Sequence, residues 1–137
     1  MKKIFVDTNI LVDLIADRQP FSKYAIEIFT SAERRNIMLF TSSHSIATTF
    51  YLLKKHTDDR ALRKVIYFLM DYIKVLSIDE AILKKGLQSK FRDFEDAVQI
   101  FCAMKIESMD FIVTRNPRDF KDSPIPVVPP DQLCLII

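Results

Sequence analysis

Two short apolar runs in this sequence end abruptly at polar residues, and this arrangement restricts the possible folds more than any other feature. Residues 3–6 end at Asp7, and residues 111–114 end at Arg115 and Asn116. Neither run alternates between apolar and polar side chains, which is typical of strands buried on both faces of a parallel sheet. In open sheets of this kind, ligands bind at the carboxyl ends of the strands, where these polar residues lie.

Helical patterns alternate with short apolar strands along the chain. We expect strands over residues 3–6, 37–41, 75–77, 111–114 and 127–128. We expect helices over residues 8–15, 20–35, 45–55, 58–73, 79–89 and 93–106. Thr8 or Asn9 can cap the first helix. The inward stripe of the last helix consists of Phe94, Ala97, Val98 and Phe101. The alternation predicts a three-layer α/β/α sandwich with a parallel sheet of about five strands, in one domain over residues 1–137.

Composition places the chain among folded globular proteins. Its 137 residues suit one domain, and 49% hydrophobic with 28% charged residues is unlike a disordered chain. The net charge of +2 is too small to indicate nucleic-acid binding, so any electrostatic argument must rest on local clusters. The single glycine, Gly86, excludes a Walker A loop and a dinucleotide-binding fingerprint, since both need several glycines at fixed spacing.

Nothing in the sequence indicates membrane insertion, a disulfide framework or a zinc site. The longest uncharged apolar run, residues 65–70, is far shorter than the roughly 18 residues that a membrane-spanning helix needs. No secretory signal precedes the first strand, so we expect a cytoplasmic protein without membrane contact. Cys102 and Cys134 form no CxxC pair, and we expect a plain core thiol at Cys102. His44 and His56 have no second His or Cys nearby in the sequence.

Acidic residues are concentrated where the first strand ends and where the helix over residues 93–106 begins. Asp93 and Asp96 are three residues apart and share one helix face, with Glu95 between them. The helix dipole favours acids in a first turn by only about 0.3–1 kcal/mol each, whereas neighbouring carboxylates repel one another. Asp7 can likewise serve as a helix cap. A divalent metal ion is the alternative that would explain both positions, because it removes the repulsion.

Three strings in the sequence are informative in combination: VDTNILVDL at residues 6–14, DFEDAVQIFCA at residues 93–103 and FIVTRNPRDF at residues 111–120. Together they resemble the PIN domain, the metal-dependent nuclease fold of many bacterial toxin–antitoxin toxins, over essentially the whole chain. The resemblance implies hydrolysis of single-stranded RNA with Mg²⁺ or Mn²⁺, where the metal polarises the phosphoryl oxygen and activates a water. It further implies a small cognate antitoxin as protein partner.

The resemblance also assigns catalytic roles to polar residues of these strings. It implies that Asp7 and Asp96 hold the metal, with Asp93 as an additional ligand one turn earlier. Asn116 would assist catalysis by holding the metal or its water through the amide oxygen. Glu95 points about 100° away from Asp96 on a helix of 3.6 residues per turn, and we expect it to be solvated.

Other residues of these strings are expected to support the catalytic ones. Thr8 and Asn9 would hold the loop and orient Asp7 through short hydrogen-bonding side chains. Thr114 resembles the hydroxyl-bearing residue that the family has at the end of this strand. Asp119 is the nearest carboxylate to Asn116, and capping of the local turn explains it equally well.

One acid of the family pattern is missing from this chain. The family often has a Glu on the helix after the second strand, and Thr48 occupies the matching position. No Asp or Glu occurs between residues 34 and 57, so Thr48, Thr49 or Ser45 can offer a hydroxyl or hold a water but cannot supply a charge. Because Mg²⁺ and Mn²⁺ depend on charged oxygen ligands, we expect weaker metal binding than in a complete site.

Basic and aromatic residues suggest further contacts. Arg115 and Arg118 flank Asn116 and are the best candidates to bind an RNA phosphate, which arginine can grip with two hydrogen bonds. The other basic runs, at residues 54–56 and 84–92, are typical of solvated helix faces and helix ends. Aromatic side chains on the helices at 45–55 and 58–73 exceed what one buried face needs, which favours a homodimer contact.

These patterns favour a metal-dependent endoribonuclease, the toxin of a toxin–antitoxin pair. The missing acid at Thr48 favours an alternative, a catalytically degenerate PIN fold that binds RNA or protein. A third interpretation is a phosphatase with a strand-end Asp as nucleophile. That chemistry usually has a second acid two residues later, where this chain has Asn9.

Overall fold

A sheet of five parallel strands forms the centre of the computed structural model, which describes residues 1–137. The strands are β1 (Lys2–Val6), β2 (Ile37–Ser42), β3 (Ile73–Leu76), β4 (Phe111–Val113) and β5 (Val127–Val128). The helices are α1 (Thr8–Ala16), α2 (Ser22–Glu33), α3 (Ser43–Leu53), α4 (Asp59–Leu69), α5 (Glu80–Gln88), α6 (Phe94–Ala103), the 3-10 helix η1 (Pro117–Phe120) and α7 (Pro130–Cys134). The strand order is β3-β2-β1-β4-β5, and the predicted α/β fold is confirmed.

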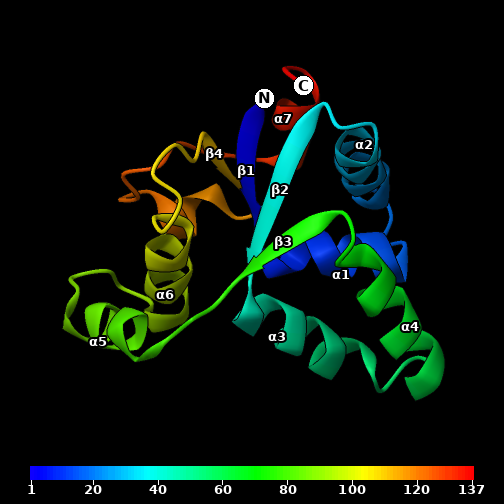
Figure 1. Ribbon diagram of the computed structural model, residues 1–137, viewed down its shortest axis with the longest axis horizontal. Helices are drawn as coiled ribbons and strands as arrows, with labels where there is room; N and C mark the ends of the chain where they lie inside the picture. The colour runs from blue at the N-terminus through cyan, green and yellow to red at the C-terminus, as the bar shows by residue number, and fades with distance from the viewer.

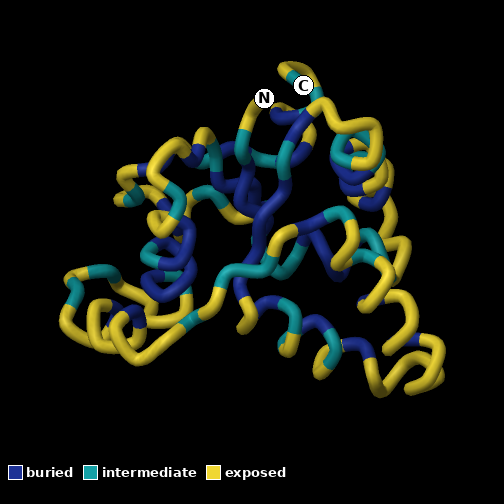
Figure 2. Tube along the Cα trace, in the orientation of Figure 1, coloured by how far each residue is buried: buried dark blue, intermediate teal, exposed yellow.

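Side chains that alternate along β1 enter two different cores, one on each face of the sheet. Ile4 and Val6 pack with residues of α1, α2 and α7, whereas Phe5 packs with residues of α5 and α6. Figure 1 shows α2 on one side of β1 and β2 and α6 on the other. The strands follow the buried centre of the chain trace in Figure 2. Burial of both faces explains why the strand sequences are continuous apolar runs.

Helices α3 and α4 form an outer pair that packs on α1. The cluster that joins the three helices consists of Val12, Leu53, Leu62 and Ile66. The pair and the residue that follows α4 expose six large apolar side chains, namely Tyr51, Leu52, Val65, Tyr67, Phe68 and Met70. None of the helices is both long enough and apolar enough to cross a membrane.

The helix expected over residues 58–73 is shorter in the structure. It ends at Leu69, and the chain then turns so that Ile73 begins β3 and pairs with Leu39 of β2. Ile73 continues the helical spacing of the apolar residues before it, so the sequence extends the helix too far, and pairing with β2 places Ile73 in a strand instead. The short helix α7 is not indicated by the sequence pattern, since it lies in a proline-rich segment.

Phe94 is exposed rather than part of the inward stripe of α6. It is the first residue of the helix and lies beside Gly86 of α5. A Cβ atom at Gly86 would come within 3.2 Å of the Phe94 ring and 2.9 Å of Val98. The single glycine of the chain therefore lets α5 pack closely against the start of α6.

The direction in which the chain adds strands to the sheet reverses at β1. Strands β2 and β3 extend the sheet on one side of β1, and β4 and β5 extend it on the other. Such a reversal opens a crevice outside the carboxyl ends of the central strands. The Asp7 backbone amide donates a hydrogen bond of 3.0 Å to the Val113 carbonyl. The polar residues that follow β1 and β4 therefore meet at one edge of the sheet.

Candidate active site

Asp7 links the end of β1 to the start of α1, and both of its carboxylate oxygens accept hydrogen bonds. Oδ1 accepts one from the Thr8 backbone amide at 2.8 Å, and Oδ2 accepts one from the Thr114 hydroxyl at 2.7 Å. Asp7 is therefore the N-cap of α1, which corrects the expectation that Thr8 or Asn9 caps this helix. Longer contacts add to these bonds, one of 3.4 Å from the Gln99 amide nitrogen to Oδ1 and one of 3.5 Å from the Asn9 amide nitrogen to Oδ2, and together they hold the carboxylate in one orientation.

Asn9 and Thr114 tie the loop after β4 to the start of α1. The Asn9 amide nitrogen donates to the Thr114 hydroxyl at 3.2 Å, and its amide oxygen accepts a bond from the Arg115 backbone at 3.3 Å. The Thr114 hydroxyl also accepts a bond of 3.1 Å from the Asn116 backbone amide. The contacts fit the supporting roles expected of Asn9 and Thr114, and they fix the backbone that carries Asn116.

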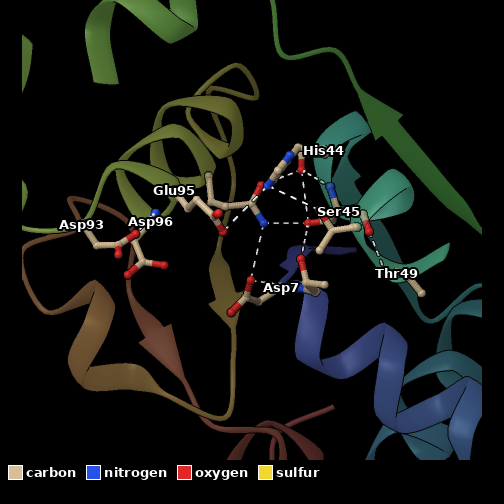
Figure 3. Close-up of polar contacts among 11 residues, drawn as sticks. Asp7, His44, Ser45, Thr49, Asp93, Glu95 and Asp96 are labelled. Carbon is tan, nitrogen blue, oxygen red and sulfur yellow. Dashed lines mark hydrogen bonds and ion pairs between the residues drawn. The ribbon is translucent and has the colours of Figure 1, made fainter. Parts of the chain in front are cut away.

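Gln99 of α6 is a buried polar residue that the motifs did not single out. Its amide oxygen accepts a hydrogen bond from the Ser42 hydroxyl at 2.5 Å. Its amide nitrogen donates to the Ser45 hydroxyl at 2.6 Å and to Asp7 Oδ1 at 3.4 Å. The Thr8 hydroxyl donates to the same Ser45 hydroxyl at 2.9 Å. Figure 3 shows the contacts that extend from Asp7 to Ser45, so one hydrogen-bonded network connects β1, α3 and α6.

Three acids from separate segments line one pocket of about 290 Å³ at the carboxyl edge of the sheet. Asp7 follows β1, Asp96 lies in the first turn of α6, and Asp119 lies in η1. The wall also contains eight further polar side chains, those of Thr8, Asn9, Arg18, His44, Thr48, Glu95, Gln99 and Asn116. The structure thus brings together residues that the sequence placed at one site although they lie far apart in the chain.

Asp93 does not line this pocket. It is the N-cap of α6, and its Oδ1 accepts a hydrogen bond from the Asp96 backbone amide at 3.0 Å. Figure 3 shows Asp93 and Asp96 together at the start of α6, on the opposite side of the view from Ser45. The capping bond accounts for the presence of Asp93 at this position, and its role as an additional metal ligand stays a prediction.

Burial and mutual repulsion both act on the acids of the pocket. Burial is the largest cause that raises the pKa of Asp96 to about 7, and nearby carboxylates add to it, those of Asp93 and Asp7 first. Burial also raises the pKa of Asp7, against the hydrogen bond from Thr114. Near neutral pH the pocket therefore gathers negative charge that its own hydrogen bonds do not fully stabilise, as is typical of functional sites.

The stability of the metal-free protein is expected to fall as the pH rises from about 4 to about 7. The pKa of Asp96 is higher in the folded protein than in the unfolded chain, so the folded protein binds this proton more tightly. The stabilisation is fully present below the unfolded pKa and is lost as the pH passes the folded pKa. Asp96→Asn should therefore raise the melting temperature in EDTA at pH 7 and reduce the pH dependence. A variant that melts below the wild type at pH 7 would show that the carboxylate stabilises the helix end instead.

The donor atoms of the pocket suit a hard divalent cation. The carboxylates of Asp7, Asp96 and Asp119 and the amide oxygen of Asn116 are the oxygen ligands that Mg²⁺ and Mn²⁺ prefer. No three His, Cys, Asp or Glu side chains lie close enough together to hold a metal ion by themselves. Mg²⁺ usually keeps several waters and uses only one or two protein carboxylates. A pocket that offers one or two carboxylates and leaves room for water therefore suits such an ion. The raised pKa of Asp96 is consistent with a carboxylate that a cation would stabilise.

Gln99→Leu is expected to lower the free energy of unfolding by about 1–3 kcal/mol, because the buried Ser42 and Ser45 hydroxyls lose a partner. It should also weaken Mn²⁺ binding by about 10–100-fold, the usual effect of removing a group that orients a metal ligand. Gln88→Leu makes the same change at an exposed position of α5 and should alter stability by less than about 0.5 kcal/mol. Urea denaturation and calorimetry measure the two effects. Equal stability of the two variants would mean that the network does not support the fold.

Arg115 lies against the buried side chain of Asp13 rather than in the pocket. Its Nε is 2.7 Å from Asp13 Oδ2, and its guanidinium lies 4.3 Å from the centre of the Phe21 ring. Asp13 is 1% exposed, so this ion pair matches the charge of Arg115 within the fold. A contact between Arg115 and RNA stays a prediction that the pairing does not favour. Arg118 is exposed and takes part in no ion pair, and Arg18, which no motif indicated, lines the pocket.

Thr48 lines the pocket at the position where the family pattern has an acid. Its hydroxyl lies 3.4 Å from His44 Nε2, and the same nitrogen lies 3.8 Å from the Glu95 carboxylate. Thr49 is turned away, since its hydroxyl donates to the Ser45 carbonyl at 2.7 Å. Among the three hydroxyl residues considered for this position, Thr48 is the one that faces the pocket.

Known proteins share the arrangement of this chain. The chain is 28% identical to Ribonuclease VapC1 of Aquifex aeolicus (strain VF5) over 138 residues, which cover 97% of this chain and 94% of that protein. The fold resembles that of VapBC2 from Rickettsia felis, solved with a DNA fragment of its promoter, with a TM-score of 0.66 and 18% identity over 93% of this chain and 98% of the other. It also resembles Mycobacterium tuberculosis VapC20, described as a Sarcin-Ricin loop cleaving toxin, with a TM-score of 0.61 and 19% identity over 80% and 86% of the two chains.

The sequence profile of one family matches most of the chain, including most of the residues that line the pocket. It is the profile of the PIN domain, and it matches residues 3–118. The matched region contains Asp7, Asp96, Asn116 and the parallel strands β1 and β4. The likeness to the solved structures agrees with this match at the level of the fold. The chain therefore belongs to the PIN domain family.

Proposed function

We propose that this protein is a metal-dependent endoribonuclease that hydrolyses single-stranded RNA and acts as the toxin of a toxin–antitoxin pair. The observation that carries the proposal is the convergence of Asp7, Asp96 and Asp119 in one pocket at the reversal point of the sheet. Similarity to a protein named Ribonuclease VapC1 and to a toxin described as cleaving the Sarcin-Ricin loop supports RNA as the substrate.

In this proposal Asp7 and Asp96 hold Mg²⁺ or Mn²⁺, and Asp93 and Asn116 assist. The bound ion would polarise the phosphoryl group and lower the pKa of a water. The chain itself supplies the orientation, because hydrogen bonds from Thr8 and Thr114 fix the Asp7 carboxylate. Asp96, whose pKa is raised to about 7 in the metal-free protein, would give up its proton when the ion binds.

Two protein partners belong to the same proposal. A small cognate antitoxin would silence the enzyme, which the likeness to the VapBC2 structure from Rickettsia felis supports. A second copy of the chain would cover the apolar outer surface of α3 and α4, where Tyr67 is 78% exposed. Sedimentation analysis of the wild type and Tyr67→Lys tests the dimer. We expect the wild type to sediment as a dimer and the variant to shift toward the monomer. A wild type that sediments as a monomer would remove this part of the proposal.

Incubation of the purified protein with a labelled single-stranded RNA and Mn²⁺ tests the proposed activity. We expect cleavage in Mn²⁺ and none in EDTA. Asp7→Asn, prepared in parallel, should be inactive and serves as a blank for contaminating ribonuclease. DNA of the same sequence is a second control, since it lacks the 2′-hydroxyl by which proteins distinguish RNA. Cleavage that persists in EDTA or in Asp7→Asn would contradict the proposal.

A catalytically degenerate PIN fold that binds RNA or protein is the second candidate function. The observation that favours it is the uncharged Thr48 in the wall of the pocket, where no carboxylate of α3 replaces the missing acid. This candidate predicts that the wild type binds RNA but does not cleave it at any Mn²⁺ concentration. The cleavage experiment therefore separates the two functions.

A further inference from the structure

A second polar hollow of about 400 Å³ adjoins the pocket of the acids. Asp96 and Asp119 line both cavities, so they form the wall between them. The lining of the hollow also includes three cationic side chains, those of Arg92, Arg118 and Lys121. A ligand that bridges the two cavities would therefore cross the acids and reach a cluster of positive charge.

The three cations of this hollow are exposed and take part in no ion pair, although Asp93 and Asp122 line the same cavity. Asp93 instead accepts a capping hydrogen bond from the backbone of α6. Arg115 behaves differently, since its charge is matched by the buried Asp13. Unpaired arginines at a concave surface are well suited to hold phosphate oxygens, which their planar groups can bind with two hydrogen bonds.

The charge of the hollow depends on what the shared acids hold. The lining carries three cations and four carboxylates, those of Asp93, Asp96, Asp119 and Asp122. The net charge of the hollow without a metal ion is therefore slightly negative. A divalent cation on the shared acids would neutralise them and leave the three cations opposite only Asp93 and Asp122. Binding of an anion in the hollow should therefore be coupled to binding of the metal, and such coupling acts equally in both directions.

We propose that this hollow is a phosphate-binding subsite that holds the RNA backbone next to the phosphate to be cleaved. The inference rests on the proposed function and extends it, because it assigns Arg92, Arg118 and Lys121 to a stretch of the substrate strand beyond the metal. The hollow would contact only the sugar-phosphate backbone of the RNA and not its bases. The subsite would therefore bind RNA of different sequences with similar strength.

Fluorescence anisotropy with a labelled 12-nucleotide phosphorothioate RNA, in Mn²⁺ and over a range of salt concentrations, tests the subsite. Arg92→Gln and Arg118→Gln should each weaken binding by about 2- to 5-fold, the range for exposed charge pairs. Each should also lower the slope of log affinity against log salt by about 0.7, the value for one phosphate contact on a single strand. Asp122→Asn should act in the opposite direction and tighten binding. Arg34→Gln, at the opposite end of the sheet where α2 ends, should change nothing.

Calorimetry on the same variants separates this inference from the proposed function. Arg92→Gln and Arg118→Gln should bind Mn²⁺ in the absence of RNA with at least the affinity of the wild type, since they remove cations near the metal. A double variant that binds RNA with wild-type affinity and salt slope would overturn the subsite. Weaker Mn²⁺ binding in that variant would overturn it as well, because the arginines would then support the metal site. A wild type that neither binds nor cleaves RNA in Mn²⁺ would instead remove the proposed function itself.

Discussion

Asp7→Asn and Asp96→Asn are each expected to weaken Mn²⁺ binding by at least about 100-fold, the upper end of the loss caused by removing a group that only supports a metal ligand. Each variant keeps the shape of the side chain but removes one negative charge, and Mg²⁺ and Mn²⁺ depend on charged oxygen ligands. Glu95→Gln removes a charge from the wall of the same pocket, but from a side chain that is 73% exposed. That variant should lose less than about 5-fold, as expected for an exposed charge.

Two independent measurements check this expectation. Isothermal titration calorimetry gives the affinities directly. Thermal unfolding reports the same binding through stability, since Mn²⁺ at 100 times its dissociation constant stabilises the folded state by about 2.7 kcal/mol. The rise in melting temperature should persist in Glu95→Gln and disappear in Asp7→Asn and Asp96→Asn. Equal affinity in all three variants would rule out a shared site at Asp7 and Asp96.

The edge of the sheet that carries the pocket could be located from the sequence for a simple physical reason. Strands β1 and β4 are buried on both faces, so their apolar runs stop where the sheet stops. Asp7 and Asn116 follow these runs and could be placed at the carboxyl edge. Asp96 could be assigned to the same site because the helix begins with three acids, Asp93, Glu95 and Asp96, and the helix dipole alone does not require so many.

Contacts between distant segments could not be predicted in the same way. Gln99 lies three residues after Asp96 and shares its helix face, but its partners Ser42 and Ser45 come from another part of the chain. A lone Gln in an apolar stripe gives no signal until the fold shows what it touches. The same holds for Arg18, which follows α1 and lines the pocket without belonging to any motif.

The two arginines next to Asn116 show why local sequence does not determine the role of a charged residue. Arg115 and Arg118 lie within two residues of Asn116 along the chain, and both were reasonable candidates for a phosphate contact. The fold directs Arg115 to the buried Asp13 and leaves Arg118 exposed at the second hollow. A buried carboxylate is costly unless it is paired with a cation. Arg115 therefore pairs with Asp13 instead of remaining available to a phosphate.

Thr48→Glu is expected to tighten Mn²⁺ binding by about 1–3 kcal/mol, the scale of an interaction with a charged partner in a partly buried site. Thr48 already lines the pocket that contains Asp7, Asp96 and Asp119, so the new carboxylate would face the proposed metal. His44 lies beside it and provides a hydrogen-bonding neighbour. The substitution restores the acid that the family pattern has at this position.

Without metal, Thr48→Glu should be less stable than the wild type. A further carboxylate adds repulsion to a pocket in which burial and neighbouring acids already raise the pKa of Asp96 to about 7. In EDTA at neutral pH, Thr48→Glu should therefore melt below the wild type, whereas saturating Mn²⁺ should reverse the order. Thr48→Gln is the matched control, because it has nearly the same shape without the charge. It should show neither the lower stability in EDTA nor the tighter binding.

Cleavage of single-stranded RNA by Thr48→Glu connects this position to the choice between the two candidate functions. We expect faster cleavage than in the wild type at limiting Mn²⁺, and Asp7→Asn in the Thr48→Glu background serves as the blank. Unchanged metal affinity in Thr48→Glu would mean that residue 48 does not face the ion, and the proposed site would then be wrong. Tighter binding without cleavage in either protein would favour the degenerate fold, because the charge would be restored while the chemistry stayed absent. Cleavage that rises together with affinity would show that the missing charge limits the wild-type enzyme.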